Sequence, residues 1–254
     1  MASQTTFPDA PPAERVRHDL KRRELTVSSV ERVTPNMLRI TLTGPDLADF
    51  PSASPDDHVK VFITGSDGQP QMRDYTPRRF DRATCELVLD FALHEAGPAT
   101  AWALSAAPGD PLTVGGPRGS LVLSSDIKRF LLIGDETALP AIGRRIEEAG
   151  SDVDIIVYAA VTGPEEQQTF ETEATVSLNW VHRPAEDAAS AQRILGVLQD
   201  VTIAPGTYVW IAAEASVARA VRSHLVGTVG YPLAWIKASG YWLLGQADAH
   251  EKLD

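Results

Sequence analysis

The spacing of hydrophobic and polar positions changes about halfway along the chain. In the first half, short runs rich in β-branched and aromatic residues stand between Gly, Pro and Asp, at 25–27, 37–43, 58–64, 85–93 and 112–114. Such runs are typical of strands, and together they predict an antiparallel β-barrel. Between the last two runs we expect a short helix over 98–107, because Pro108-Gly109-Asp110 would end it.

In the second half, apolar runs alternate with helix-like stretches. The apolar runs are 130–133, 153–161, 176–181 and 208–213, and the helix-like stretches are 138–149, 187–200 and 214–229. This alternation predicts a parallel sheet with helices packed on it. We therefore expect a barrel domain over 19–125, an α/β domain over 126–254, and a site in the cleft between them.

Neither end of the chain is assigned any chemistry. The first residues are polar and proline-rich without apolar periodicity, so 1–18 is expected to be a disordered arm. Residues 247–253, which include His250 and Glu251, are predicted to form a short amphipathic C-terminal helix.

Composition excludes several classes of protein. The chain has 254 residues, of which 43% are hydrophobic and 22% charged, as in soluble globular proteins. A formal charge of -11 argues against general nucleic-acid binding. One cysteine, Cys85, and scattered histidines make a disulfide, zinc or iron–sulfur centre improbable. No apolar stretch reaches the length of a membrane span and no signal peptide is visible, so a cytoplasmic location is expected.

A first candidate site is Arg73-Asp74-Tyr75-Thr76-Pro77-Arg78. Side chains at alternate strand positions share one face, so we expect an arginine, an aromatic ring and a hydroxyl on a common surface. Arg73 would contact the pyrophosphate of a flavin, Tyr75 would lie against its ring system, and Thr76 would offer a hydroxyl to its N5. An ordinary polar edge strand remains an alternative interpretation.

A second candidate site is Gly134-Asp135-Glu136-Thr137-Ala138-Leu139-Pro140-Ala141, after a buried apolar run. Open α/β sheets bind nucleotides at this end of their strands. Because an acidic pair replaces the usual glycine-rich loop, we expect a nicotinamide here rather than a pyrophosphate. Thr137 is a candidate N-cap, and a plain helix start is the alternative.

Five segments resemble siderophore-interacting proteins, a family of FAD-dependent ferric-siderophore reductases. They are Arg73–Arg78, Phe91–Trp102, Gly116-Pro117-Arg118-Gly119-Ser120, Gly134–Ile142 and Gly240-Tyr241-Trp242, in the family's order, and the resemblance covers about residues 20–245. It implies a flavin-binding barrel followed by a nicotinamide-binding α/β domain, as in ferredoxin reductases.

The resemblance extends the set of expected cofactor-binding residues. Around the flavin they are Arg73, Tyr75, Thr76, Asp90, Phe91, Leu93, His94, Gly97, Pro98, Ala99, Thr100, Trp102, Gly116, Pro117, Gly119 and Ser120, with Thr76 and Tyr75 nearest the reaction. At the nicotinamide they are Asp135, Glu136, Thr137 and Ala138, while Tyr241 and Trp242 would cover the flavin or the adenine. Core packing for Trp102, Tyr241 and Trp242, a strand-end histidine for His94, and simple hairpin geometry for the glycine turn remain open.

The electron donor depends on charge. No Lys or Arg occurs between Arg145 and Arg183, while Glu165, Glu166, Glu171 and Glu173 do. NADH is therefore slightly favoured over NADPH, unless Arg183, Arg219 or Arg222 reaches the ribose.

Two lysines are candidates for binding an anionic ferric chelate at the flavin edge. Lys60 precedes the flavin motif and Lys237 precedes Gly240-Tyr241-Trp242, although both could simply be solvated. The family often has Arg after Gly-Tyr-Trp, whereas this chain has Leu243.

The expected function is transfer of electrons from NADH or NADPH through FAD to a ferric siderophore, with release of Fe(II). A reductase component serving an oxygenase or a ferredoxin, and a non-enzymatic siderophore carrier, are alternatives. A ferredoxin could also replace the nicotinamide donor.

Overall fold

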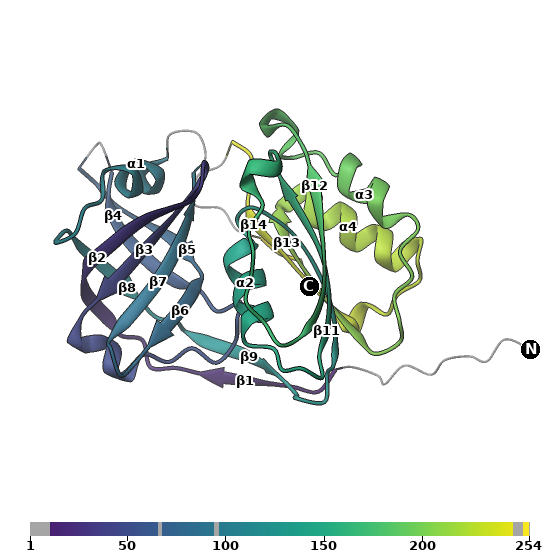
Figure 1. Cartoon of the computed structure of the whole chain (residues 1–254), viewed down its shortest axis with the longest axis horizontal. Coiled ribbons are helices and arrows are strands. Elements are labelled where there is room, and N and C mark those ends of the chain that lie inside the picture. Colours follow the sequence, from purple (N-terminus) through teal and green to yellow (C-terminus); the bar gives the residue numbers. More distant parts are fainter. Residues whose placement is uncertain (1–10, 66–67, 94–96, 246–250, 254) are drawn as a thin grey trace, which may run out of the picture. The chain divides into compact units, whose positions relative to one another are not determined.

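The computed structural model describes residues 11–65, 68–93, 97–245 and 251–253. Contacts divide the described chain into two units. The curled-sheet unit comprises residues 14–122 together with 140–145, and the α/β unit comprises the rest. Figure 1 labels most of the elements of both.

The curled-sheet unit is built on a seven-stranded sheet whose hydrogen-bonded neighbours are all antiparallel. Its order is β5-β4-β8-β2-β3-β7-β6. The strands are β2 (Arg22–Thr34), β3 (Met37–Thr43), β4 (Val59–Thr64), β5 (Pro70–Tyr75), β6 (Pro77–Asp81), β7 (Glu86–Ala92) and β8 (Pro111–Gly115). Helix α1 (Pro98–Ser105) follows β7, and β1 (Ala13–Arg17) pairs with β9 (Gly119–Leu123) in a separate two-stranded sheet.

Strict alternation of side chains forms the core of this unit. In β4 the residues Val59, Val61 and Ile63 are buried while their neighbours are not. The same period of two places Leu25 and Val27 of β2 in the same core. One face of the sheet is therefore apolar, as a half-buried antiparallel sheet requires.

The α/β unit contains a six-stranded sheet of order β12-β11-β10-β13-β14-β15, parallel except for β15. The strands are β10 (Arg129–Asp135), β11 (Asp154–Val161), β12 (Thr175–His182), β13 (Thr207–Glu214), β14 (Ile236–Trp242) and β15 (Glu251–Leu253). Helices α3 (Gln192–Leu198) and α4 (Ala215–Gly227) belong to this unit, whereas residues 140–145 of α2 (Leu139–Glu147) are grouped with the curled-sheet unit. Figure 1 shows α3 and α4 together on one face of this sheet, where they share a core with β10 and β13.

The strand order fixes where a ligand belongs. From β10, the next strands in sequence, β11 and β12, are added on one side of the sheet, and β13 and β14 are added on the other side. The strand order therefore reverses between β10 and β13. Nucleotides bind in open sheets outside the carboxyl ends of the strands at such a reversal. Every residue of β13 and all but the first of β10 are buried, which explains their continuous apolar runs.

The structure confirms the expected fold class, an antiparallel sheet followed by a parallel α/β sheet. The first sheet is curled rather than closed, because no ladder joins its edge strands β5 and β6 among the described residues. None of the helices in the described part of the chain has the length and apolarity needed to span a bilayer.

Two expectations about the chain ends are wrong. Residues 13–17, placed in the disordered arm, form strand β1, because β9 offers a pairing edge and the His18 N–H also donates to the Arg118 carbonyl. Residues 251–253, placed in a C-terminal helix, form β15, which completes the edge beside β14. Residues 247–250 of that predicted helix lie outside the described residues.

Candidate functional site

The flavin motif lies at the end of β5. Arg73 is within the strand and donates to the Met72 carbonyl and to Gln71 Oε1, at 2.8 and 2.9 Å. Tyr75 is the last residue of β5, and burial raises the pKa of its phenol. Thr76, 7% exposed, is the single residue between β5 and β6. The expectation of one shared face is therefore wrong for Thr76, because it directly follows Tyr75 and lies outside the strand.

Behind Tyr75 lies a row of aromatic rings. The ring of Tyr75 is 4.2 Å from that of Phe91, which is 5.6 Å from that of Trp102 in α1. Phe91 is fully buried and Trp102 packs on the same core. Trp102 thus packs on the core, its contact with a cofactor stays a prediction, and the row gives the Tyr75 ring a rigid support.

Asp90 binds arginines in the structure. Its carboxylate, 3% exposed, accepts two hydrogen bonds from the Arg39 guanidinium, both at 2.8 Å, and Arg78 Nε lies 3.7 Å away. From the sequence, Asp90 was expected at the cofactor and neither arginine was expected to have a role. A signal existed, since Arg39 is the one charged residue of its strand and is the direct cross-strand partner of Asp90.

The glycine turn after β8 needs its glycines. Gly116 has φ +92, a conformation that favours glycine, as the sequence predicted. A side chain on Gly119 would approach the Val16 carbonyl oxygen to 2.5 Å, so β1 also excludes a larger residue there. Next to it, the Ser120 hydroxyl donates to Asp57 at 2.6 Å and lies 2.8 Å from His18 Nε2. The turn is not a hairpin, because β8 and β9 belong to different sheets. Contact of Gly116, Pro117, Gly119 and Ser120 with a flavin stays a prediction.

Helix α1 opens as predicted, with Gly97 extended before Pro98. Ala99 is buried and Thr100 half-buried in the first turn, where backbone N–H groups lack intrahelical acceptors. Leu93 donates its N–H to the Asn36 carbonyl at 2.8 Å. His94 lies outside the described residues.

The two candidate lysines belong to different units and have different surroundings. Lys60 of β4 forms an ion pair with Asp74 at 2.8 Å, so it is not simply solvated. Lys237 lies in β14, half-buried, and pairs in register with Trp210. Binding of an anionic chelate by either lysine stays a prediction.

Asp135 occupies the point where the order of the parallel sheet reverses. It ends β10, and its carboxylate is 2% exposed. Oδ2 accepts from the Glu214 N–H at the end of β13 and from Trp242 Nε1 at the end of β14, both at 2.9 Å. Oδ1 accepts from the backbone N–H and the hydroxyl of Thr137. One carboxylate thus joins the carboxyl ends of three strands.

Thr137 does not cap the helix as expected. Its hydroxyl donates to Asp135, and α2 begins only at Leu139. Ala138 is fully buried, so its side chain faces the core. The cap that sequence reasoning missed is Glu214, whose carboxylate accepts from the N–H groups of Ser216 and Val217 at the start of α4. Its position as the first residue of the helix-like stretch 214–229, directly after an apolar run, was the available signal.

Glu136 lies beside Asp135 and binds Arg183. Arg183 Nη2 donates to Glu136 Oε2 at 2.8 Å, and the arginine side chain is only 4% exposed. Burial raises the pKa of the Glu136 carboxyl to about 7, the negative charge of Asp135 adds to the increase, and Arg183 opposes it. Both carboxylates of the acidic pair therefore have partners within the chain: backbone and indole N–H groups bind Asp135, and an arginine binds Glu136.

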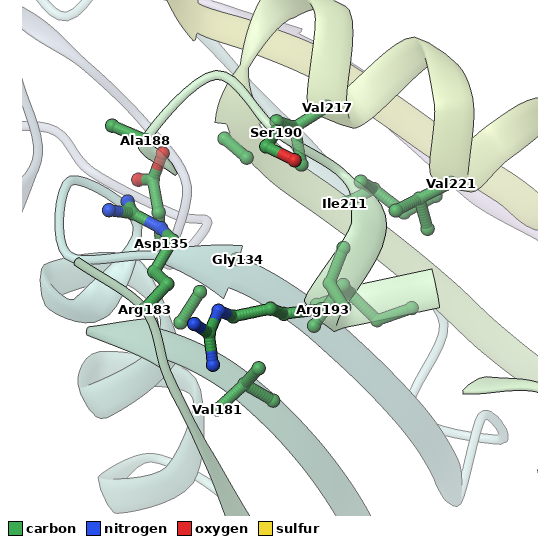
Figure 2. Close-up of a pocket in the computed structure, with 14 residues that line it drawn as sticks. Gly134, Asp135, Val181, Arg183, Ala188, Ser190, Arg193, Ile211, Val217 and Val221 are labelled. Carbon is green, nitrogen blue, oxygen red and sulfur yellow. The ribbon is translucent and has the colours of Figure 1, made fainter. Parts of the chain in front are cut away.

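A pocket opens at the carboxyl ends of the parallel strands, under α3 and α4 (Figure 2). Most lining residues are apolar, including Ile211, Val217 and Val221. Its polar members are Asp135, Arg183, Ser190 and Arg193. Sequence reasoning named the first two, but Ser190 and Arg193 come from a stretch that it treated only as a helix.

Tyr241 and Trp242 end β14 with both side chains half-buried. The Tyr241 ring meets that of Trp210 edge-on at 6.0 Å, and the Trp242 indole is held by Asp135. Tyr241 therefore packs on the sheet, while the position of Trp242 depends on a carboxylate 107 residues earlier.

Glu136 gives a testable dependence of stability on pH. Between its ordinary value of 4.5 and about 7, the folded chain holds a proton that the unfolded chain has lost, so raising the pH through this window lowers the free energy of unfolding. In Glu136→Gln this loss should shrink by on the order of 2 kcal/mol between pH 5 and pH 8, as expected for a shift of this size. Urea unfolding at both pH values measures it.

The control is Glu173→Gln, since Glu173 is exposed. It should leave the pH dependence of the wild type unchanged. If Glu136→Gln also leaves it unchanged, the carboxyl titrates at its ordinary value in the folded chain.

Comparison with known proteins covers both units. Residues 26–69 and 63–121 match the family model described as the siderophore-interacting FAD-binding domain. Residues 127–245 match the model described as siderophore-interacting protein.

Three relatives illustrate the match. The NADPH-dependent ferric-chelate reductase of Escherichia coli (strain K12) is 43% identical over 152 residues, which cover 53% of this chain and 59% of that protein. The ferric vibriobactin reductase of Vibrio cholerae is 30% identical over 184 residues, covering 65% of this chain and 67% of that protein. The crystal structure of a siderophore utilization protein from T. fusca matches with a TM-score of 0.86 and 30% identity, over 94% of this chain and 98% of that one.

Proposed function

The chain belongs to the siderophore-interacting protein family, and on that premise we propose that it is an FAD-dependent reductase that takes electrons from NAD(P)H and delivers them to a ferric siderophore. The observation that carries the proposal is the match of both units to the two family models. Two relatives named as reductases of ferric chelates support the substrate class.

The residues of the curled-sheet unit fit a flavin. The Tyr75 ring is half-buried and supported by Phe91, so it offers an aromatic face of fixed orientation. Arg73, half-buried two residues earlier on the same strand face, has a planar fork of N–H donors suited to phosphate oxygens. Thr76 adds a hydroxyl directly after the ring. Bound FAD would supply the redox chemistry, because it accepts two electrons from a nicotinamide and can release them singly.

The α/β unit fits the electron donor. Its strand order reverses at Asp135, and the carboxyl ends beside this point are where a nicotinamide nucleotide would lie. Trp242 Nε1 donates a hydrogen bond to Asp135 there, and this bond holds the indole in place. No side chain needs to act as acid or base on the ferric substrate.

The substrate is a chelate of Fe(III) with hard oxygen donors. Such donors hold Fe(III) far more tightly than Fe(II), so reduction releases the metal while the chelator stays intact. We place the reaction in the cytoplasm, where NAD(P)H is available. Lys60 and Lys237 are the cations proposed to attract the anionic chelate.

Purified protein tests the proposal directly. It should be yellow, lose its visible flavin absorption when NADH or NADPH is added under argon, and regain it with a ferric siderophore while Fe(II) appears. Colourless protein that stays colourless after reconstitution with FAD would indicate a carrier. Bleaching without any preference for ferric chelates over a ferredoxin or oxygenase component would indicate a different reductase.

Arg73 gives a sharper test of the flavin placement. Arg73→Ala should weaken FAD binding on the order of 10- to 100-fold, because each charge-assisted contact to phosphate contributes about 1.5–3 kcal/mol. FAD retained after desalting measures it. Arg79→Ala removes an exposed arginine of β6, the next strand in sequence, and should keep the flavin. Thr76→Ala should also keep it but slow its reduction. Full flavin in Arg73→Ala contradicts the placement.

A further inference from the structure

Helix α2 carries a buried arginine that binds two separate segments of the curled-sheet unit. Arg144 is 3% exposed and belongs to the stretch 140–145, which is grouped with that unit. Its Nη1 donates to the Ser52 hydroxyl at 2.8 Å and to the Pro77 carbonyl at 3.2 Å. Its Nη2 donates to the Ser52 carbonyl at 3.4 Å, and its guanidinium carbon lies 5.3 Å from the centre of the Phe80 ring. One side chain therefore joins the loop before β4 to the start of β6.

A hydroxyl connects the charge of Arg144 to a buried carboxylate. Ser52 Oγ, which accepts from Arg144, donates to Asp57 Oδ2 at 2.9 Å. Asp57, 3% exposed, also accepts from the Ser120 hydroxyl at 2.6 Å. These directional bonds between buried groups fix the position of the guanidinium. An apolar side chain of similar volume is often at least as stabilising as a buried charge, so stability alone does not account for an arginine here.

The Pro77 carbonyl lies where the sheet holds the chain weakly. Pro77 opens β6, which is an edge strand, and it has no N–H group to donate to a ladder. The register of β6 with β7 shifts between Pro77 and Arg79, as it does at a β-bulge. Bulges of this kind redirect side chains beside functional sites. The bond from Arg144 adds an anchor from outside the sheet at this point.

We propose that Arg144 is a positioning residue for flavin reduction, which acts through the Pro77 carbonyl on the orientation of Thr76. The inference rests on the proposed function, in which the Thr76 hydroxyl interacts with the flavin. Thr76 directly precedes Pro77 and is the single residue between β5 and β6. The proline ring fixes its own φ and restricts the backbone of the residue before it. Holding the Pro77 carbonyl limits the rotation that remains, and so fixes the direction of the Thr76 side chain.

A positioning role predicts a change in rate rather than in affinity. The proposed phosphate contact of Arg73 does not depend on Arg144, so the Kd of FAD should stay close to that of the wild type. Misplacing a reacting group by about 1 Å can lower a rate on the order of 100-fold. Arg144→Met fills similar space without donors, and it should slow reduction of the bound flavin by NADH or NADPH on the order of 10- to 100-fold.

The test is a double-mutant cycle of Arg144→Met and Thr76→Ala. The measured quantity is the rate at which bound flavin bleaches under argon with saturating donor. If Arg144 acts through Thr76, the double variant should be no slower than the slower single variant, because residues that act as a unit have non-additive effects. A double variant in which the two effects multiply overturns the proposal.

The visible circular dichroism of bound FAD gives a second readout, which does not depend on turnover. The spectrum should change in Arg144→Met and in Thr76→Ala. It should return toward the wild-type spectrum in Arg144→Lys, because an ammonium group is still able to donate to the Pro77 carbonyl. The control is Arg145→Met, which replaces the next, half-buried residue of α2 and should leave the spectrum unchanged. A wild-type spectrum in Arg144→Met overturns the proposal.

Ser52→Ala separates positioning from stability. It removes the hydroxyl between Arg144 and Asp57 but leaves the bond from Arg144 to the Pro77 carbonyl in place. This variant should lower the free energy of unfolding and reduce flavin at a rate much closer to that of the wild type than Arg144→Met does. Equal slowing in both variants would mean that they act by loosening the unit, and would overturn the proposal. If Arg144→Met does not fold, Arg144→Lys replaces it in the cycle under the same criterion.

Failure of this inference is distinguishable from failure of the proposed function. If Arg144→Met reduces its flavin at the wild-type rate while the wild type reduces ferric chelates, the reductase assignment stands and the positioning role falls. If the cycle is non-additive but no ferric chelate is reduced, the positioning role stands and the assignment of the substrate falls. Wild-type protein that binds no FAD overturns both.

Discussion

Replacing Asp135 by asparagine should destabilise the α/β unit by about 3 kcal/mol or more. The Asp135 carboxylate accepts from four donors, two on each oxygen. An asparagine keeps one oxygen, so its NH₂ group must face either the donors of Thr137 or those of Glu214 and Trp242. Buried donors then face each other without an acceptor. Urea unfolding followed by tryptophan fluorescence measures the loss.

The matched control is Asp152→Asn. Asp152 also forms a hydrogen-bonded ion pair, with Lys128, but on the surface, so its replacement should cause little or no change. Reduction of the flavin by nicotinamide should slow in Asp135→Asn under conditions where the variant is folded, because Trp242 loses its anchor. A variant as stable as the wild type would mean that Asp135 does not hold the strand ends together.

Asp135 also shows where sequence reasoning reached its limit. The position after a buried strand predicted the correct end of the sheet, because the carboxyl end of a central parallel strand is readable from one apolar run. The sequence interpretation then treated the acidic pair as a charge facing the ligand. In the structure two of the four donors to Asp135 come from Glu214 and Trp242, and such distant partners leave no local signal.

The same difference between local pattern and distant partners explains which strands the sequence predicted and which it missed. The change from period two to alternating runs predicted both sheets, since it reflects burial within each strand. Strand β14 was missed because Ile236-Lys237-Ala238-Ser239-Gly240 has only a partly buried pattern and no apolar run. Strand β1 was missed because only pairing with β9 orders it. Both β14 and β1 form through pairing with strands distant in sequence, and neither the composition nor the hydrophobic period of a segment indicates such pairing.

Asp90→Ala should be the most damaging single change in the curled-sheet unit, with an expected loss of about 3–5 kcal/mol. Asp90 is buried and holds Arg39 through two hydrogen bonds of 2.8 Å, with Arg78 at 3.7 Å. Removing the carboxylate leaves the two guanidinium groups, which are 26% and 6% exposed, without their common anion. Since Phe91 follows Asp90 in β7, the support of the Tyr75 ring should loosen as well, and FAD retention should fall.

A double variant separates lost charge pairing from lost packing. Arg39→Met/Asp90→Leu removes the bidentate pair and fills similar volume with apolar atoms, so it should recover part of the stability lost in Asp90→Ala. Recovery will be incomplete, because Arg78, with 6% of its side chain exposed, still lacks the carboxylate. If the double variant is no more stable than Asp90→Ala, packing around β7 and not the arginine pair determines the loss. Urea unfolding of the three proteins at one pH decides between these accounts, because the bidentate contact couples Arg39 directly to Asp90.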